Sequence, residues 1–445
     1  MGPPNPARPD ADTPTSLIGR DPTRSSRNPE ISRESDRTLK ENMSSIRLLA
    51  IADSESYLKW AAHLLQALTD NHADASVDVA IIDSPIRPTA AQVQHAVAGT
   101  QWAHGRVRVL DGEQLTQELD ESQPNVILAA ATGPVVERIF SVAASRPQRP
   151  ALVSGLPGMG LPATVKGQKY RRLGDLFIAH SEVEREAYAI AAERAGIGTR
   201  QAVARLPMLK SAGLPHIVSQ HDHPVTTVVF ATQAKVPVQR GQRRQILLAL
   251  AEFARRDPDH RAILKVRSLP GEHETHREKH SFIEILDELV CDGVVPESAI
   301  DVMAGPMTDF LQPGTALVTV SSTAALESLD RGLPTLIIGD FGVTLRNLNK
   351  VFIGSGIIGS LFDVAAGRFQ FAREEWLLDN YFQPRTEEVH AELSGLAKLA
   401  SAGRLRSVPW AIEIYKLRRF RQQIRASAPR PVLRIYRKAR KALRF

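Results

Sequence analysis

The sequence has almost no cysteine. Cys291 is the only one among 445 residues, so an intramolecular disulfide is impossible and nothing points to an oxidising compartment. The sequence also lacks a run of about 18 apolar residues, and its first residues contain no apolar signal core. We therefore expect neither a membrane-spanning helix nor secretion by a signal peptide.

Several catalytic signatures are missing as well. The sequence contains no Walker A phosphate-binding loop, no nucleophile elbow and no protein-kinase signature. What is present is an ordinary balance of 43% hydrophobic and 24% charged residues, as in soluble globular proteins. The length suits two or three domains.

Positive charge is concentrated near one end. Residues 409–445 contain twelve Lys or Arg and one acidic residue, Glu413, and so carry +11. The whole chain carries +7, which leaves −4 for the rest. This distribution argues against nucleic acid as a partner and favours a local basic contact surface.

The basic segment divides at Pro429 and Pro431 into two pieces with amphipathic spacing. Basic amphipathic helices bind anionic membrane surfaces, so we predict such a contact, mainly through 430–445. We expect residues 409–424 to pack against the N-terminal domain instead. We expect a cytoplasmic protein that is peripheral on the inner face of the plasma membrane.

Apolar runs alternate with amphipathic stretches after a polar segment, 1–45, that we predict to be disordered. The alternation predicts an α/β fold with parallel sheets: two Rossmann-like domains facing each other across a cleft. The expected domains are an N-terminal acceptor domain at 46–215, a donor domain at 216–365, a helical crossover at 366–408 and the basic tail at 409–445. The expected strands are 46–52, 77–83, 107–110, 125–131, 151–155, 175–180, 226–232, 261–267, 300–303, 316–320 and 335–339.

The stretch VTVSSTAALESLDRGLPTLII, residues 318–338, places three hydroxyl side chains where a strand passes into a short helix. Ser321, Ser322 and Thr323 lie at the expected helix N-terminus, and Gly332 suits the position after its C-cap. Hydroxyl donors at a positive helix end suit a phosphate. The alternative is a helix cap with no ligand.

This order of strand, Ser-Ser-Thr, helix, Gly-x-Pro and strand resembles the GT-B glycosyltransferases. It is most similar to bacterial capsule and cell-surface polysaccharide enzymes, including sialyltransferases and glycerophosphotransferases. The resemblance implies that Ser321, Ser322 and Thr323 bind the phosphate of a nucleotide donor. Glu327, one turn further along the helix, is also expected to bind the donor. No cofactor and no metal ion are implied.

Two longer stretches carry the same resemblance. Residues 228–267 resemble the start of a GT-B donor domain, and residues 155–184 resemble part of uncharacterised glycosyltransferases of this type. The first likeness implies that Thr232, Gln233 and Lys235 lie in a loop beneath the nucleotide.

The stretch 267–280 departs from the sialyltransferases, which have a His-Pro pair there. Arg267 stands where the His would be, and Pro270 comes two residues late. We expect Arg267 and His276 to contact the donor, or else to belong to a solvated charged helix. The spacing of His276 and His280 would suit a metal ion, but the surrounding Lys and Arg oppose a cation.

Two carboxylates are candidates for the general base. Asp53 and Glu55 follow the first strand, and either can take the proton from an acceptor hydroxyl. The alternative is helix capping at this point. The sequence has no match to the acidic pair followed by Gly that supplies the base in some related enzymes.

Two further turns are candidates for acceptor contact. Thr132 and Gly133 precede a helix opened by a proline, which is also what an ordinary strand-to-helix turn looks like. Gly155, Gly158 and Gly160 predict a flexible loop that is open to an acceptor. Their spacing is not the dinucleotide-binding fingerprint.

Together these features predict a glycosyltransferase that moves a sugar from a nucleotide sugar to a cell-surface glycan or lipid-linked acceptor. One alternative is a nucleotide-sugar 2-epimerase. That family carries Asp-Ser-Gly-Gly where the strand passes into the helix, whereas this sequence has Ser321, Ser322 and Thr323 there, which we call the hydroxyl joint. A second alternative is a non-catalytic nucleotide-binding or scaffold protein on the same fold.

Overall fold

A computed structural model of the chain describes residues 46–211, 213–266, 279–384 and 387–409, with 413, 416, 417 and 420 beyond them. The segment predicted to be disordered, most of the basic tail, Arg267 and His276 lie outside the described residues.

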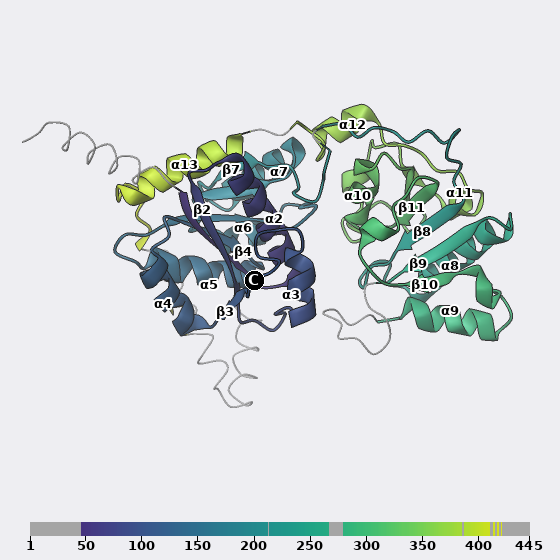
Figure 1. The fold of residues 1–445 in the computed structure, drawn as a ribbon, viewed down its shortest axis with the longest axis horizontal. Coiled ribbons are helices and arrows are strands. Elements are labelled where there is room, and N and C mark those ends of the chain that lie inside the picture. The colour runs from purple at the N-terminus through teal and green to yellow at the C-terminus, as the bar shows by residue number, and fades with distance from the viewer. Residues whose placement is uncertain are drawn as a thin grey trace, which may run out of the picture. The chain divides into compact units, whose positions relative to one another are not determined.

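The first sheet, in the described part of the chain, has seven parallel strands in the order β3-β2-β1-β4-β5-β6-β7 (Figure 1). Ala50 of β1 pairs with Val79 of β2 on one side and with Leu128 of β4 on the other. The strands are β1 (Ile46–Ala52), β2 (Ala75–Ile82), β3 (Arg108–Leu110), β4 (Val126–Ala130), β5 (Ala151–Gly155), β6 (Leu176–Ala179) and β7 (Arg200–Val203).

Helices cover both faces of this sheet, which is why its strands are continuously apolar. Leu48 and Ala50 face one buried core, to which α2 contributes, and Leu49 and Ile51 face another, to which α4 and α5 contribute. The connecting helices are α2 (Glu55–Asn71), α3 (Ala90–Val97), α4 (Gly112–Ser122), α5 (Gly133–Ala144), α6 (Val165–Tyr170) and α7 (Glu182–Arg194).

The second sheet, again within the described residues, has six parallel strands in the order β10-β9-β8-β11-β12-β13. The strands are β8 (Thr227–Ala231), β9 (Arg261–Lys265), β10 (Asp301–Met303), β11 (Thr315–Thr319), β12 (Thr335–Ile338) and β13 (Ile358–Gly359). The helices are α8 (Arg240–Arg255), α9 (Phe282–Cys291), α10 (Ala324–Asp330), α11 (Leu361–Ala365) and α12 (Glu374–Asp379), with 3₁₀ turns η1 (Glu297–Ala299), η2 (Met307–Asp309) and η3 (Lys350–Phe352).

Helix α13 (Glu388–Ser401) belongs to the core of the first sheet. Its Leu393 and Leu396 are buried there, and the helix contacts β1, β4, β5 and β7. The preceding helix α12 instead buries Trp376 and Leu377 in the core of the second sheet. The segment expected to be a helical crossover is therefore shared between two cores.

The predicted fold class is confirmed: two α/β domains, each built on a parallel sheet. Two strands escape the sequence analysis. β7 has only Ala202 and Val203 buried, because it is an edge strand, and β13 has only two residues. None of the described helices is both long and apolar enough to cross a membrane.

Candidate active site

The order of strands in each sheet defines a topological switch point. It lies between β1 and β4 in the first sheet and between β8 and β11 in the second. Ligands of open α/β sheets bind at the carboxyl ends of the strands at such a point. Predicted site residues follow all four strands: Asp53 after β1, Thr132 after β4, Gln233 after β8 and Ser321 after β11.

The two strands of the second switch point are linked by Gln233. Its side-chain oxygen accepts hydrogen bonds of 3.0 Å from both the backbone N–H and the hydroxyl of Ser321. Thr319 adds a second link, because its hydroxyl donates to the carbonyl of Ala231 at 3.0 Å. Ser321 is buried, so its hydroxyl fixes the shape of the joint.

The next two hydroxyls are only half-buried. Ser322 accepts a hydrogen bond of 3.2 Å from the N–H of Ala324 and so caps α10. Thr323, the N-cap residue by position, makes no capping hydrogen bond with its side chain. The capping alternative thus accounts for Ser322 and leaves Thr323 unexplained.

The end of the short helix α10 agrees with the sequence analysis. Gly332 follows the C-cap residue Arg331 and has φ +65°. A Cβ on Gly332 would lie 1.7 Å from the carbonyl oxygen of His216, so only glycine fits. Glu327 lies in the first turn and is half-buried.

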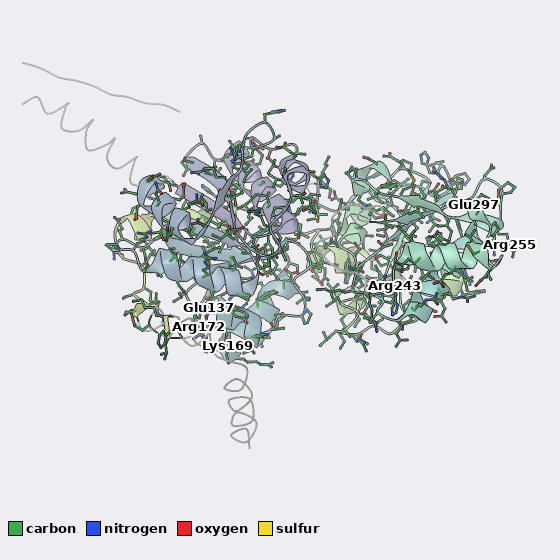
Figure 2. The ribbon with its side chains drawn as sticks, turned by 90° about the horizontal axis from the view of Figure 1, so that it is seen from below. Glu137, Lys169, Arg172, Arg243, Arg255 and Glu297 are labelled. Atoms are coloured by element: carbon green, nitrogen blue, oxygen red, sulfur yellow. The ribbon has the colours of Figure 1, made fainter. Side chains whose placement is uncertain are left out.

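The loop after β8 is shaped by a buried arginine on α8, Arg243 (Figure 2). Its guanidinium donates to the carbonyls of Ala234 and Pro237 at 2.9 Å and to the carbonyl of Gln233 at 3.3 Å. A further hydrogen bond goes to the carbonyl of His280. Arg243 therefore holds the backbone on which Gln233 sits.

The other predicted donor residues of this loop are less buried. Thr232 is half-buried and donates its N–H to the carbonyl of Lys265 at 3.1 Å, while Lys235 is exposed.

The glycine loop after β5 reaches the hydroxyl joint. A Cβ on Gly158 would lie 2.8 Å from the Cγ2 of Thr323, so the backbone of Gly158 packs directly against the side chain of Thr323. Gly155 is the last residue of β5, and a Cβ there would lie 2.6 Å from the ring of Trp60. The structure thus brings together two predicted groups, the acceptor loop and the donor joint.

This loop is anchored, although the sequence analysis expected a flexible one. Buried Glu184 accepts the N–H of Gly160 at 2.6 Å and the N–H of His180 at 2.9 Å. The hydroxyl of Tyr381 donates to Glu184 at 2.8 Å, and that of Tyr188 donates to the carbonyl of Gly160. The glycines serve close packing here.

Asp53 and Thr132 are bonded to each other across the first switch point. One carboxylate oxygen of Asp53 accepts the N–H of Thr132 at 2.8 Å and its hydroxyl at 2.6 Å. Asp53 is fully buried, and its other oxygen, Oδ1, has no hydrogen-bond partner among the described residues. Ser54, the N-cap residue of α2, makes no capping bond, so the predicted capping box is absent.

The second candidate base lies in a different setting. Glu55 begins α2, and its Oε1 lies 3.0 Å from the Nδ1 of His95 on α3. About a third of the Glu55 side chain is exposed (34%), so a substrate can reach it. Gly133, next to Thr132, is a packing glycine, because a Cβ there would lie 2.5 Å from Tyr170.

Two tyrosines of the first domain, Tyr57 and Tyr188, are buried. Burial raises the pKa of Tyr57 to about 12; the charge of Asp53 adds to the shift and that of Arg171 opposes it. Burial also raises the pKa of Tyr188 well above its usual value, and the charge of Glu184 adds to this shift. The phenol groups of Tyr57 and Tyr188 are therefore held away from bulk water.

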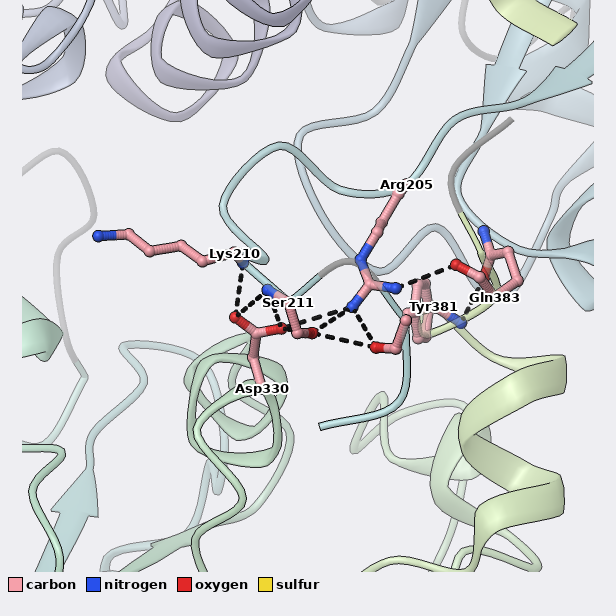
Figure 3. Close-up of polar contacts among 7 residues, drawn as sticks. Arg205, Lys210, Ser211, Asp330, Tyr381 and Gln383 are labelled. Atoms are coloured by element: carbon pink, nitrogen blue, oxygen red, sulfur yellow. Dashed lines mark hydrogen bonds and ion pairs between the residues drawn. The ribbon is translucent and has the colours of Figure 1, made fainter. Parts of the chain in front are cut away.

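The C-terminal end of α10 is tied to the segment that follows β7 (Figure 3). Asp330 accepts hydrogen bonds from the N–H of Lys210 at 2.6 Å and from Ser211. Arg205, also in contact with Asp330, donates to the carbonyl of Gln383 at 3.0 Å. This network fixes the helix that begins at the hydroxyl joint.

Sequence reasoning missed Glu184, Arg205, Arg243, Asp330 and Tyr381. A signal exists for Arg243, which extends the apolar stripe of α8 by one turn before Ile246 and Leu250. The others make contacts between distant segments and leave no local pattern.

Comparisons with solved structures show the fold. A protein described as a "putative UDP-N-acetylglucosamine 2-epimerase" from Listeria monocytogenes is 11% identical, with 81% of this chain and 98% of that chain covered and a TM-score of 0.50. Anabaena Alr3699/HepE in complex with UDP and glucose is 12% identical, with 84% and 100% covered and a TM-score of 0.44. Phytolacca americana UGT2 complexed with UDP-2fluoro-glucose and pterostilbene is 12% identical, with 80% and 94% covered and a TM-score of 0.44.

The two Rossmann-like domains are thus of the GT-B type. No curated protein is significantly similar to this chain. One family profile matches residues 48–396, which is most of the chain and includes every described candidate residue. The chain therefore belongs to the family described as "Putative glycosyltransferase (DUF6716)".

Proposed function

We propose that the protein transfers a sugar from a nucleotide-activated donor to a cell-surface glycan or lipid-linked acceptor, as bacterial capsule enzymes do. The supporting observation is the joint after β11 in a chain of a glycosyltransferase family. Its half-buried hydroxyls, Ser322 and Thr323, follow a strand at the switch point and lie beside the glycine loop.

In this proposal the three hydroxyl groups of the joint have different roles. Ser321 is held by Gln233 and keeps the backbone in shape. Ser322 and Thr323 donate to the phosphate of the donor, which is the group with the largest charge on a nucleotide sugar. Hydrogen bonds to a charged group contribute about 1.5–3 kcal/mol each.

The acceptor is deprotonated by Asp53 or Glu55. Asp53 has a buried oxygen with no partner among the described residues, whereas Glu55 is more accessible and paired with His95. The base takes the proton of the acceptor hydroxyl as this oxygen attacks the anomeric carbon.

The first test is a thermal-shift panel of nucleoside mono- and diphosphates, because a ligand that binds only the folded state raises its stability. We expect one nucleobase to stabilise the protein. Ser322→Ala and Thr323→Ala should each weaken that binding by about 1–3 kcal/mol, measured by calorimetry.

The matched control is Thr89→Ala, which removes a hydroxyl cap from α3. It should lower stability slightly and leave nucleotide affinity unchanged. Unaltered affinity in both joint variants would mean that the joint is only a helix cap. A panel with no stabilising nucleotide would favour the scaffold alternative.

The epimerase alternative has support from the fold of the Listeria protein. It is separated from glycosyl transfer by incubating the protein with a nucleotide sugar alone. An epimerase forms the C2 epimer without any acceptor, whereas a transferase requires one.

Membrane contact by the basic tail is a second part of the proposal and is supported by the sequence. The tail carries +11, and each basic residue near an anionic surface contributes about 1 kcal/mol. The full chain should sediment with anionic vesicles at low salt and be released as salt rises. A chain shortened to end at Ala428 should stay in the supernatant; equal sedimentation of both would leave the tail without this role.

A further inference from the structure

Two histidines and two carboxylates lie close together where α13 begins. His72 is the C-cap residue of α2, Asp74 lies just before β2, Glu387 is the N-cap residue of α13, and His390 lies within α13. The Nε2 of His72 is 2.8 Å from Glu387, and the Nε2 of His390 is 3.4 Å from Asp74.

The two imidazole rings are stacked face to face. Their centroids are 3.4 Å apart and their planes differ by 2°. An imidazole binds a metal ion in the plane of its ring, and the lone pairs of parallel rings point in parallel directions. One of the two rings must therefore turn before both can bind one ion.

The backbone that carries this cluster is fixed on both sides. The turn from α2 to β2 is closed by a hydrogen bond of 3.3 Å from the N–H of Ala75 to the carbonyl of His72, and the carbonyl of Asp74 accepts the N–H of Ile46 at 3.1 Å. On the other side, α13 buries Leu393 and Leu396 in the core of the first sheet. The ligands are therefore presented by two rigid elements.

The dimensions suit a small cation after side-chain rotation. One ligand atom each from His72, Asp74 and His390 lie within 4.8 Å of one another. A tetrahedral ion with bonds of about 2 Å places its ligand atoms about 3.3 Å apart. The required closure of about 1.5 Å and the turn of one imidazole ring need only side-chain torsions, because Asp74 is well exposed (48%). Glu387 is not one of these three residues, but its carboxylate lies 2.8 Å from the Nε2 of His72 and is exposed (75%), so it can turn towards the same ion.

We propose that His72, Asp74, His390 and Glu387 bind a zinc ion that fastens α13 to the first domain. Two imidazoles select zinc or a similar transition ion over calcium and magnesium, which prefer oxygen ligands. Four protein ligands fill a tetrahedral shell, which is typical of a structural site, whereas a catalytic zinc keeps one open position. No residue of the candidate active site takes part.

The test uses the full chain, free of any histidine tag and treated with a chelator. Zinc titration by calorimetry should show saturable binding of one ion, and Co²⁺ should give the visible absorption of a tetrahedral complex. Zinc should also raise the melting temperature. His390→Ala and Asp74→Asn should each weaken zinc binding at least tenfold.

The matched control is His95→Ala, which removes another histidine paired with a carboxylate, Glu55. It should leave zinc affinity unchanged. Circular dichroism checks folding; if His390→Ala does not fold, Asp74→Asn, which keeps the side-chain shape, decides the matter. No saturable binding, or equal affinity in the wild type and Asp74→Asn, would overturn the proposal and leave an ion-pair cluster only.

Discussion

The carboxyl edges of the two sheets differ in how their polar groups are satisfied. At the second sheet, Gln233, Thr319 and Arg243 bond to neighbouring backbone and hydroxyl groups and leave the half-buried Ser322 and Thr323 at the surface of the joint. At the first sheet, buried polar atoms have no hydrogen-bond partner among the described residues: Asp53 Oδ1, Trp60 Nε1, both side-chain atoms of Gln168 and Arg171 Nε.

Under the proposed function, this difference corresponds to two kinds of binding edge. A buried polar atom without a protein partner costs about 1–3 kcal/mol unless water or a ligand supplies the hydrogen bond. At the second edge, Gln233 and Ser321 bond to each other without a ligand, which under the proposed function suits a donor phosphate of constant shape. The first edge is incomplete, which suits a hydroxyl-rich acceptor or ordered water.

The largest expected effect is a loss of stability on replacing Arg243, whose side chain holds the loop after β8 at the second edge. Arg243→Met keeps much of the volume but removes the donors for four backbone carbonyls. We expect a loss of about 4 kcal/mol in the free energy of unfolding, measured by urea denaturation, because buried acceptors are left unsatisfied. Nucleotide binding should also fall.

Arg255→Met is the control, since Arg255 lies at the exposed end of the same helix and, among the described residues, bonds to Glu252 within that helix. Its effect should stay below about 0.5 kcal/mol. Similar losses in the two variants would mean that Arg243 does not organise the loop.

The sequence analysis succeeded for features of the fold and the candidate site that depend on residues close together in the chain. Apolar runs predicted most strands, and Gly332 was recognised because helix termination demands a left-handed residue. Gln233 and Ser321 were predicted for the same donor site, and the structure shows them bonded to each other. Each of these assignments depended on residues within one strand–loop–helix unit.

The analysis failed where partners are far apart in the chain. Glu184 and Tyr381 are 197 positions apart and meet beside the glycine loop. Asp330 bonds to Ser211 across 119 positions. Such pairs are set by how the helices and linkers pack, which no local periodicity records, and β7 was missed because an edge strand needs few buried residues.

The next prediction concerns catalysis at the first edge. Positioned general bases contribute about 100-fold or more to turnover, or about 3 kcal/mol. If Asp53 is the base, Asp53→Asn should lower transfer from the nucleotide sugar by that factor with donor affinity unchanged. Transfer of labelled sugar to a lipid extract is the measurement.

Glu55→Gln is the paired variant, because it removes the other carboxylate and leaves the bond between Asp53 and Thr132. We expect one variant to lose turnover and the other to keep it. Full turnover in both would exclude these residues as the base, and loss of folding in Asp53→Asn would show a structural role instead.

The smallest expected effect concerns the exclusion of water from Tyr57 at the first edge, and it appears only at alkaline pH. The pKa of Tyr57 is about 12 in the folded protein, against the usual 10.0. A raised pKa means that folding favours the protonated phenol. The resulting stability is fully present below pH 10 and is lost as the pH rises towards 12.

Tyr57→Phe removes this titration and keeps the packed ring. Between pH 10 and 12 the wild type should lose about 2 kcal/mol more of its free energy of unfolding than the variant does, because each unit of pKa shift corresponds to about 1.4 kcal/mol. Urea midpoints at pH 8, 10 and 11.5 provide the measurement. Tyr170→Phe, which removes a half-buried phenol near Gly133, should follow the wild type. If the free energy of unfolding changes with pH in the same way for the wild type and Tyr57→Phe, water reaches Tyr57 in the folded protein. The two sheet edges would then differ less than their buried polar atoms indicate.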